Sequence, residues 1–206
     1  MKFSAIPSWC LACLMILLWA ASPSAQQDSA TNAIRHTVNL LTYVLKDPEL
    51  KKTQNVEKRR SDALRIIRNR FEFDEMAKRS MGTHWKGLSD TRRKEFIELF
   101  TRLLEAEYAD KIESYNDEKV VFKPEELIGP EMAEVRTYIV TKDDVISVNY
   151  RCMYLDKSWK VYDVVIEGMS LVNNYRSQFN ELMLKESYEG LIARLKTKTG
   201  KMKPIQ

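Results

Sequence analysis

The chain has 206 residues, of which 44% are hydrophobic and 30% are charged, and its formal net charge is +4. This composition is typical of a globular protein with a sizeable core, and it excludes an intrinsically disordered chain. The near balance of acidic and basic residues neither demands nor excludes an anionic partner.

The first 25 residues predict a secretory signal peptide that is cleaved after export. One charge, Lys2, precedes the apolar run 11–20, and small residues follow it. The run is shorter than the roughly 20 apolar residues of a membrane span. We expect cleavage between Ser22 and Gln26, which leaves one mature domain over 26–206.

Cysteine usage is consistent with export of a protein without a lipid anchor. Lipid attachment needs a cysteine just after the apolar run, whereas Cys13 lies near its start. Cys10 is also lost with the signal, so Cys152 is the single cysteine of the mature chain and forms no intramolecular disulfide. Loss of Lys2 leaves 32 basic and 29 acidic residues, a net charge of +3.

The first half of the mature chain shows helical periodicity. Ile34, Val38 and Leu41 recur at helical spacing before Pro48, and an apolar stripe follows the long segment 89–115. Asp74 and Ser89 are expected as N-caps, and Gly82 as a C-terminal stop. Helices are therefore predicted over 30–48, 57–71, 71–82 and 89–115.

The middle of the chain changes to a period of two. One face of 144–156 is expected to carry Ile146, Val148, Tyr150, Cys152 and Tyr154. Strands are predicted over 118–124, 131–142, 144–156 and 158–168, with a tight turn at Asp156-Lys157.

The strands should form an antiparallel meander with one face packed on helices. Two further helices are predicted, over 170–184 and 188–198, with a break near Ser187. The fold class expected from this order is α+β.

No residue pattern predicts a nucleophilic active site, a metal site or a cofactor. His36 and His84 lack nearby ligands at metal spacing, and Cys152 is expected to be an inert buried thiol. The six glycines form no phosphate-binding loop.

The basic clusters at 58–60 and 65–70 have two interpretations. They form either a solvated helix face or a docking surface for an acidic partner protein. Nucleic acid is not expected as a partner, because the chain is exported and the clusters lack stacking aromatic residues.

Asp163 is an acid within a strongly apolar strand. Strict alternation places it with Trp159, Val161 and Val165 on one face. It is either a general base, with Tyr150 or Tyr162 as the second proton-handling group, or a structural partner of an arginine. The candidate arginines are Arg136, Arg151 and Arg176.

The strand-to-helix corner that follows Asp163 is crowded with large apolar residues. Packed core and a ligand cavity would show the same pattern. The residues of this corner are Trp159, Tyr162, Val164, Ile166, Met169, Val172, Tyr175 and Phe179.

Four segments resemble the MlaC/Ttg2D family, whose members are also called toluene tolerance proteins. They are "FDEMAKRSMGTHWKGLSDTRRKEFIELFTRLLEAEYADKI", "AEVRTYIV", "WKVYDVVIEGMSLVNNYRSQF" and "YEGLIARLK". The resemblance covers 71–196, while 28–70 is similar only in helical character. It implies a fold like that of nuclear transport factor 2 (NTF2-like), with helices on a curved sheet of about four strands around a hydrophobic pocket.

The resemblance also implies a function, that of a periplasmic phospholipid carrier and not an enzyme. The expected partners are phospholipid, an inner-membrane MCE-type ABC transporter complex and an outer-membrane lipoprotein complex, and the carrier is expected to be a monomer. The family has a hopanoid-associated branch, so a related lipid could replace phospholipid as the cargo. Two competing functions are an NTF2-like enzyme that acts on a hydrophobic small molecule and a ligand-free adaptor that binds protein partners.

The resemblance places the residue after the "EG" of the corner in the lipid pocket, which here is Met169. The full set of expected lipid-binding residues is Met169, Val164, Ile166, Tyr162, Val172, Phe100, Val148 and Tyr175.

Overall fold

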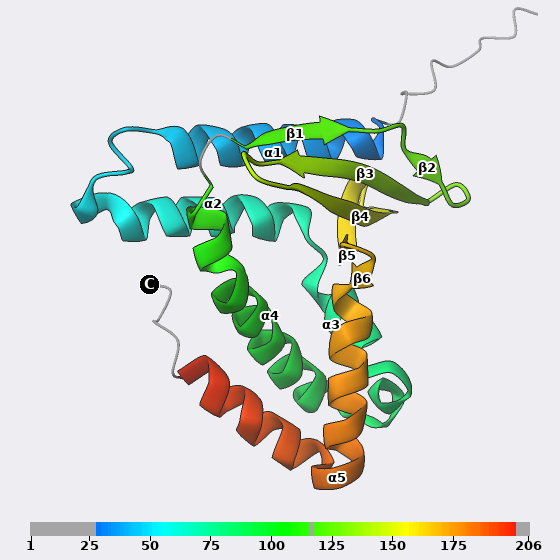
Figure 1. The fold of residues 1–206 in the computed structure, drawn as a ribbon. Coiled ribbons are helices and arrows are strands. Elements are labelled where there is room, and N and C mark those ends of the chain that lie inside the picture. Colours follow the sequence, from blue (N-terminus) through cyan, green and yellow to red (C-terminus); the bar gives the residue numbers. More distant parts are fainter. Residues whose placement is uncertain (1–27, 116–117, 201–206) are drawn as a thin grey trace, which may run out of the picture.

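The computed structural model describes residues 28–115 and 118–200, and it contains helices and one antiparallel sheet (Figure 1). The predicted signal peptide lies outside the described residues. Within them, no helix combines the length and the apolar character that crossing a membrane requires. The predicted α+β class is confirmed.

Along the described part of the chain, four helices precede the strands and a fifth follows them (Figure 1). The helices α3, α4 and α5 pack together. The helices are α1 (Ala30–Lys46), α2 (Val56–Arg70), α3 (Phe73–Met81), α4 (Asp90–Glu113) and α5 (Leu171–Gly200), with short 3-10 turns at Thr53–Asn55 and Gly82–Gly87. The strands are β1 (Lys119–Phe122), β2 (Glu126–Leu127), β3 (Met132–Val140), β4 (Val145–Leu155), β5 (Ser158–Ile166) and β6 (Met169–Ser170).

The sheet has the strand order β1-β3-β4-β5-β6, and β2 pairs with the start of β3. All pairings within it are antiparallel. The expected sheet of about four strands is therefore extended by two strands of two residues each, β2 and β6. Asp156 and Lys157 have φ of 49° and 62°, which is the geometry of a two-residue hairpin turn, and they confirm the predicted turn.

One face of the sheet is apolar and carries the N-terminal half of α1. Directly paired residues share a face, and the fully buried row Ala133–Cys152–Val161 packs with Ala30 and Ile34 of α1. The predicted alternation of β4 is confirmed, because its even-numbered residues from 146 to 154 all belong to this cluster.

The opposite face of the sheet is polar. Glu134 accepts hydrogen bonds from Arg136 and Arg151 at 3.2 and 3.4 Å, and from Asn149 at 3.4 Å. These residues lie on neighbouring strands in register, so the charges of this face largely compensate one another.

A β-bulge in β5 changes the predicted faces of that strand. Arg151 pairs with Asp163 and Cys152 pairs with Val161, so Tyr162 is the extra residue. Val164 consequently joins Val161 in the apolar cluster, while Asp163 lies on the polar face with Arg151. The expectation that Asp163 shares a face with Trp159 and Val161 is wrong, because strict alternation does not survive a bulge.

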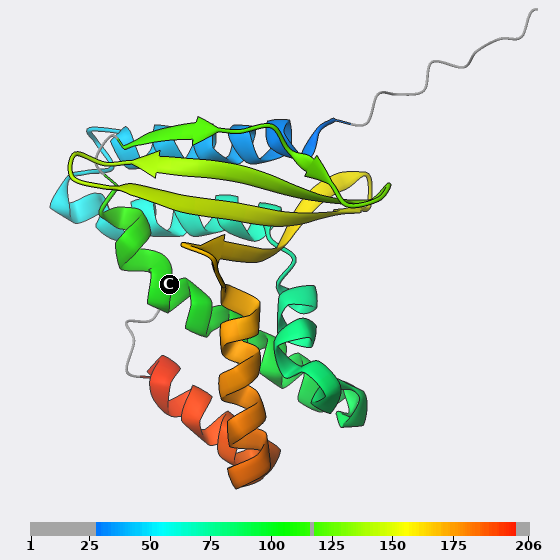
Figure 2. The same cartoon turned by 45° about the vertical axis from the view of Figure 1, so that its right-hand side comes forward.

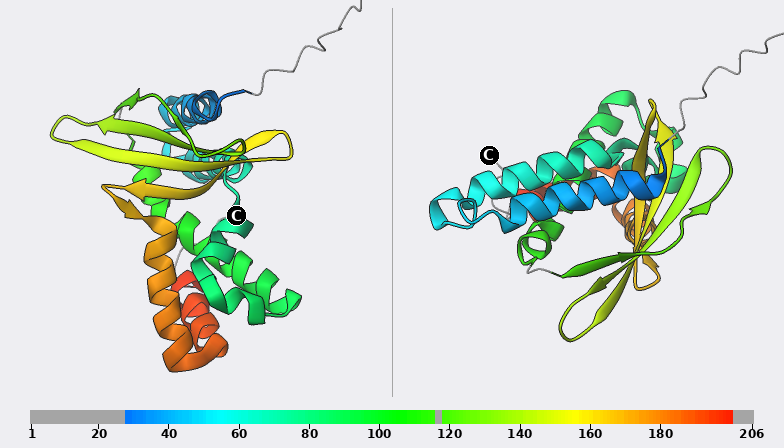
Figure 3. Two further views of the ribbon diagram at one scale, coloured as in Figure 1. Left: turned by 90° about the vertical axis from the view of Figure 1, so that its right-hand side faces the viewer. Right: turned by 90° about the horizontal axis from the view of Figure 1, so that it is seen from above.

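A second apolar cluster lies among α3, α4 and α5, which extend away from the β5–β6 edge of the sheet (Figures 2 and 3). At its centre Phe100 meets Tyr175 and Phe179 edge-on, with ring centroids 5.3 and 5.7 Å apart. Such aromatic contacts add to the stabilisation from buried apolar area.

The ends of these helices mostly follow the sequence signals. The Ser89 hydroxyl accepts a hydrogen bond from the backbone of Arg92 and caps α4 as predicted. Gly82, with φ of 55°, ends α3, but the N-cap of α3 is Glu72, and Asp74 lies in its first turn. The break predicted near Ser187 is present, because this residue has φ of 64° inside α5.

Two basic residues of α2 form ion pairs with α4. Arg60 bonds Asp110 and Glu113 near the end of α4, at 2.9 and 2.5 Å. The Arg68 guanidinium forms a two-pronged pair with Glu105 of α4, whose side chain is 1% exposed. These bridges fix α2 against α4, whereas Lys58 and Arg65 of the same basic clusters pair only with Asp62 on α2 and remain exposed.

Replacing Arg68 by alanine is expected to lower the free energy of unfolding by about 3 kcal/mol, because the Glu105 carboxylate stays buried without its counter-charge. Glu105→Gln should cost only about 1 kcal/mol, since the Arg68 side chain is 53% exposed and water can solvate it. Urea denaturation measures both values. Arg102→Ala is the matched control, because its pair with Glu98 on the same helix is exposed; equal losses in Arg68→Ala and the control would contradict the expectation.

Candidate functional site

Asp163 joins the sheet to the start of α5. Its carboxylate accepts hydrogen bonds from the Ser170 hydroxyl at 2.6 Å, the buried Val172 backbone N–H at 3.0 Å and the Arg151 guanidinium at 3.2 Å. Ser170 in turn accepts from the Asn173 backbone N–H at 3.0 Å. Two of the otherwise unpaired N–H groups at the first turn of α5 are therefore satisfied by this pair of side chains.

This arrangement favours a structural role for Asp163 over a general base. A base needs a free lone pair directed at a substrate, whereas this 3% exposed residue already accepts from three donors. Tyr150 lies on the opposite face, and the bulged Tyr162 stacks beneath the Arg79 guanidinium at 4.1 Å. Of the three arginines proposed as partners, Arg151 is the one that pairs with Asp163.

The expected lipid-binding residues are distributed over both apolar clusters. Val148, Val164 and Ile166 belong to the cluster on the sheet. The cluster among α3, α4 and α5 contains Phe100, Val172 and Tyr175. The residues that the sequence places in one corner therefore belong to two separate apolar clusters, one on the sheet and one among the helices. The chain passes from the first cluster to the second between β5 and α5.

Burial decreases along the apolar face of the sheet toward one end. Val135 and Thr137 of β3 are almost fully buried beside α1, but Ile139, next along the same face, is only half-buried. Its partner Ile146 on β4 and Ile166 on β5 are half-buried as well. The apolar face is thus incompletely covered at the end where β3 and β5 finish.

The helical cluster offers half-buried apolar side chains toward the same end. Leu171 follows β6 directly, and Tyr108 lies in the last third of α4. The chain leaves α4 and begins β1 at Lys119, which pairs with Val140 at this end of the sheet (Figure 2). Incompletely covered apolar residues of both clusters therefore lie around one corner of the molecule.

Met169 lies at the open side of this corner. It pairs with Ile166 across the turn at Glu167 and Gly168, which have φ of 49° and 78°. Cross-strand partners point to the same face of a sheet, so Met169 continues the apolar face beyond Ile166. It is nevertheless 64% exposed, which is unusual for a large apolar residue in such a position.

Sequence reasoning missed part of this corner. Ile139, Ile146, Leu171 and Tyr108 were not among the expected lipid-binding residues, although the two isoleucines have the period-two spacing of a buried face. Their half-burial depends on which part of the sheet α1 covers, and the sequence contains no signal for that.

No metal centre is indicated, because the described residues hold no group of three or more His, Cys, Asp or Glu side chains placed to bind a metal ion. His36 is exposed, and the His84 ring bonds the Asn180 side chain at 2.9 Å.

Cys152 is a buried free thiol, and burial raises its pKa to about 12. The protonated thiol is therefore favoured by folding. Its contribution to stability is full below the ordinary thiol pKa near 9 and is lost as the pH rises toward 12.

Between pH 9 and pH 11 this residue is expected to contribute a loss of stability of about 2 kcal/mol. Denaturant unfolding at both pH values gives the loss in the free energy of unfolding for the parent and for Cys152→Ala. The difference between these two losses is the contribution of Cys152. Identical losses in the two proteins would show that Cys152 does not titrate differently in the folded state.

Comparisons with known proteins agree on one family. The family model described as "MlaC protein" matches residues 35–197, so the similarity begins earlier in the chain than position 71. The intermembrane phospholipid transport system binding protein MlaC of Haemophilus influenzae is 26% identical over 120 residues. That match spans 56% of this chain and 56% of the relative, so it covers about half the length of each protein.

The fold is shared with a solved structure, that of the phospholipid-binding protein from Ralstonia solanacearum in complex with a phospholipid. The TM-score is 0.74 at 23% sequence identity, and the superposition covers 84% of this chain and 98% of the other. The mixed arrangement of helices and antiparallel sheet is therefore common to both proteins.

Proposed function

This chain belongs to the MlaC family, and we propose on that basis that it is a carrier that holds the acyl chains of a phospholipid in an apolar site. The single observation that supports this best is the incompletely covered apolar corner, which combines half-buried Ile139, Ile146 and Ile166 with the exposed Met169. The names of the Haemophilus relative and of the Ralstonia complex support the same ligand class.

The proposed site lies between the two apolar clusters. The acyl chains contact Val148, Val164 and Ile166 on the sheet side and Phe100, Val172 and Tyr175 on the helix side, with Tyr162 and Met169 at the margins. Burial raises the pKa of Tyr175 and of Tyr108 above the usual tyrosine range, so both hydroxyls stay neutral beside the chains.

The energetics of such a site suit a carrier. Each methylene removed from water contributes about 0.8 kcal/mol, so acyl chains bind tightly without specific polar contacts. The headgroup remains in water at the Met169 side, which makes binding tolerant of headgroup type. No covalent bond is made or broken, and Asp163 acts as a structural anchor.

The proposed location is the periplasm. There the protein exchanges lipid between an outer-membrane lipoprotein complex and an inner-membrane MCE-type ABC transporter complex. The predicted signal peptide and the intermembrane transport system named for the Haemophilus relative support this placement.

Native mass spectrometry of the protein purified from a periplasmic extract tests the proposal. The expected result is a species heavier than the mature chain by the mass of one phospholipid, and solvent extraction should release that lipid for identification. A hopanoid in the extract would change the cargo but keep the carrier function. If the spectra showed only the lipid-free chain, in protein from cells that make it at its natural level, the proposed carrier function would be contradicted.

A further inference from the structure

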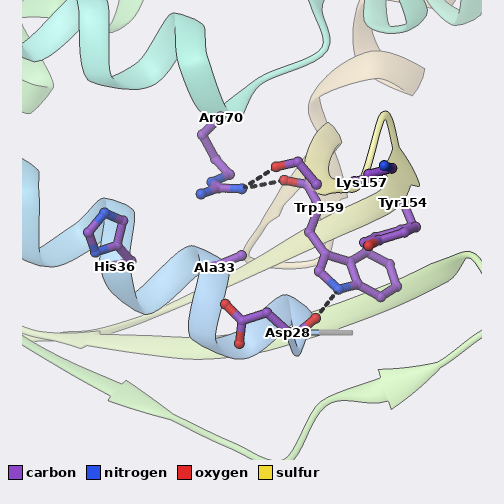
Figure 4. Close-up of a pocket in the computed structure, with 8 residues that line it drawn as sticks. Asp28, Ala33, His36, Arg70, Tyr154, Lys157 and Trp159 are labelled. Atoms are coloured by element: carbon purple, nitrogen blue, oxygen red, sulfur yellow. Dashed lines mark hydrogen bonds between the residues drawn. The ribbon is translucent and has the colours of Figure 1, made fainter. Parts of the chain in front are cut away.

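A small cavity with charged walls lies between α1, the end of α2 and the turn between β4 and β5 (Figure 4). Its volume is about 140 Å³, below the roughly 300 Å³ at which pockets for drug-sized ligands begin. It is lined by Asp28, Ala33, His36, Arg70, Tyr154, Lys157, Ser158 and Trp159.

This cavity is remote from the proposed lipid site. Trp159 stands at the start of β5 and Ile166 at its end, and seven residues of extended strand span about 23 Å. An occupant of the cavity would therefore not be part of a lipid bound at the other end of the strand.

Arg70 is held rigidly in the cavity wall. Its Nε donates to the Thr37 hydroxyl at 2.8 Å, and its Nη1 donates to the Trp159 carbonyl oxygen and to the Ser158 hydroxyl (Figure 4). Burial lowers the pKa of Arg70, a sign that its charge is only partly solvated. A guanidinium fixed in this way retains little conformational freedom, so anion binding would cost little further side-chain entropy.

Arg70 also differs from three other arginines of α2. Arg60, Arg65 and Arg68 each form an ion pair with a carboxylate, whereas the Arg59 Nε is buried without a hydrogen-bond partner among the described residues. Within the described ranges Arg70 forms no ion pair. The hydrogen bonds that hold it use Nε and Nη1, so the Nη2 donors remain available to a ligand. A half-buried cation without a carboxylate partner is costly unless an anion approaches it.

The other walls strengthen the positive character of the cavity. Lys157 is exposed at the turn and His36 is exposed on α1. The one acid of the lining, Asp28, accepts a hydrogen bond from the Asn32 side chain at 3.0 Å, and its backbone carbonyl accepts from the Trp159 indole at 2.5 Å. Arg70 and Lys157 thus bring two permanent positive charges to the lining, against the one negative charge of Asp28, which acts on Arg70 without forming an ion pair with it.

We propose that this cavity binds a single oxyanion group, either a phosphate or a carboxylate. The planar guanidinium of Arg70 supplies directed donors, and Lys157 supplies a second positive charge at the rim. The volume admits one such group and not an acyl chain. This inference is independent of the proposed lipid function, because neither the cavity nor its readout involves the lipid site.

Trp159 provides the readout, because its indole forms part of the cavity wall. Of the four tryptophans, Trp9 and Trp19 lie in the predicted signal peptide, so Trp85→Phe leaves Trp159 as the only indole of the mature chain. The mature protein with this change is titrated with potassium phosphate and, separately, with potassium acetate. Potassium chloride keeps the ionic strength constant, and Trp159 emission is recorded.

The expected result is a saturable change in emission with phosphate, acetate or both, and none with chloride alone. Lys157→Asn, which suits the left-handed backbone at this position, should raise the apparent dissociation constant by about 5-fold, as expected for loss of one nearby charge. His36→Gln tests the third wall and should also weaken binding. Lys51→Gln removes an equally exposed charge far from the cavity and should leave the constant unchanged.

The pattern of responses assigns the ligand class, since a response to phosphate alone indicates a phosphate group and a response to acetate alone a carboxylate. The absence of a saturable change with either anion would overturn the inference. Equal weakening by Lys157→Asn and Lys51→Gln would overturn it too, because it would indicate diffuse screening. Arg70→Lys keeps the charge and removes the planar fork, and saturation should be lost in that variant; if it does not fold, the Lys157 and Lys51 variants decide the question.

Discussion

Replacing Asp163 by alanine is expected to destabilise the protein by about 3–5 kcal/mol. The change removes the acceptor of three hydrogen bonds and leaves the buried Val172 backbone N–H and the Arg151 guanidinium without their partner. Unpaired groups of this kind cost their full desolvation free energy, so the loss exceeds that of an ordinary polar substitution. Equilibrium urea unfolding gives the value directly.

Two further variants separate the contributions to this loss. Asp163→Asn keeps an oxygen for the Val172 N–H but loses the charge that pairs with Arg151, so its loss should be smaller. Ser170→Ala removes one donor to Asp163 together with the hydroxyl that accepts from the Asn173 N–H, and should cost about 1 kcal/mol. A loss below about 1 kcal/mol for Asp163→Ala would show that the connection between the sheet and α5 does not depend on this carboxylate.

Replacing Met169 by glutamate is expected to reduce the lipid that co-purifies with the protein by about tenfold or more, while the protein remains folded. Met169 is 64% exposed in this structure, so the change should hardly affect stability. The added carboxylate lies beside Ile166 on the apolar face, and an acyl chain would have to cover it. Burying an unpaired charge costs well over the 1.4 kcal/mol that corresponds to tenfold in affinity.

The measurement is the ratio of extracted lipid to protein in matched preparations. Leu184→Glu is the control, because Leu184 is a comparably exposed apolar residue, at 74%, far along α5 from the corner. Met169→Leu should retain the full load. An undiminished lipid load in Met169→Glu would remove this residue from the proposed site.

The helices and strands could be predicted because their signals are local. The stripe along 89–115, the Ser89 cap and the alternation of 144–156 each depend on neighbours within a few residues. The bulge at Tyr162 could not be predicted, because nothing in the spacing of β5 marks where two residues oppose one on β4. That single extra residue decides which face Asp163 and Val164 occupy.

The candidate site was predicted less completely for a related reason. Arg151 was one of three possible partners for Asp163, and strand register, which the sequence does not specify, selects it. The paired roles of Arg68 and Arg60 with α4 depend on how two distant helices cross, so the basic clusters of α2 resemble surface features in the sequence. The prediction of Met169 rests on family resemblance and not on periodicity.

The division of the apolar residues into two clusters has a consequence for cooperativity. Phe71, between α2 and α3, is the one side chain that packs against both clusters in the described part of the chain. Apolar clusters that share one side chain can open at different free energies, as separate parts of the native ensemble, and the contacts of Asp163 and Arg68 limit this separation. A ligand that contacts both clusters binds only while both are folded, so its binding free energy opposes the opening of either one.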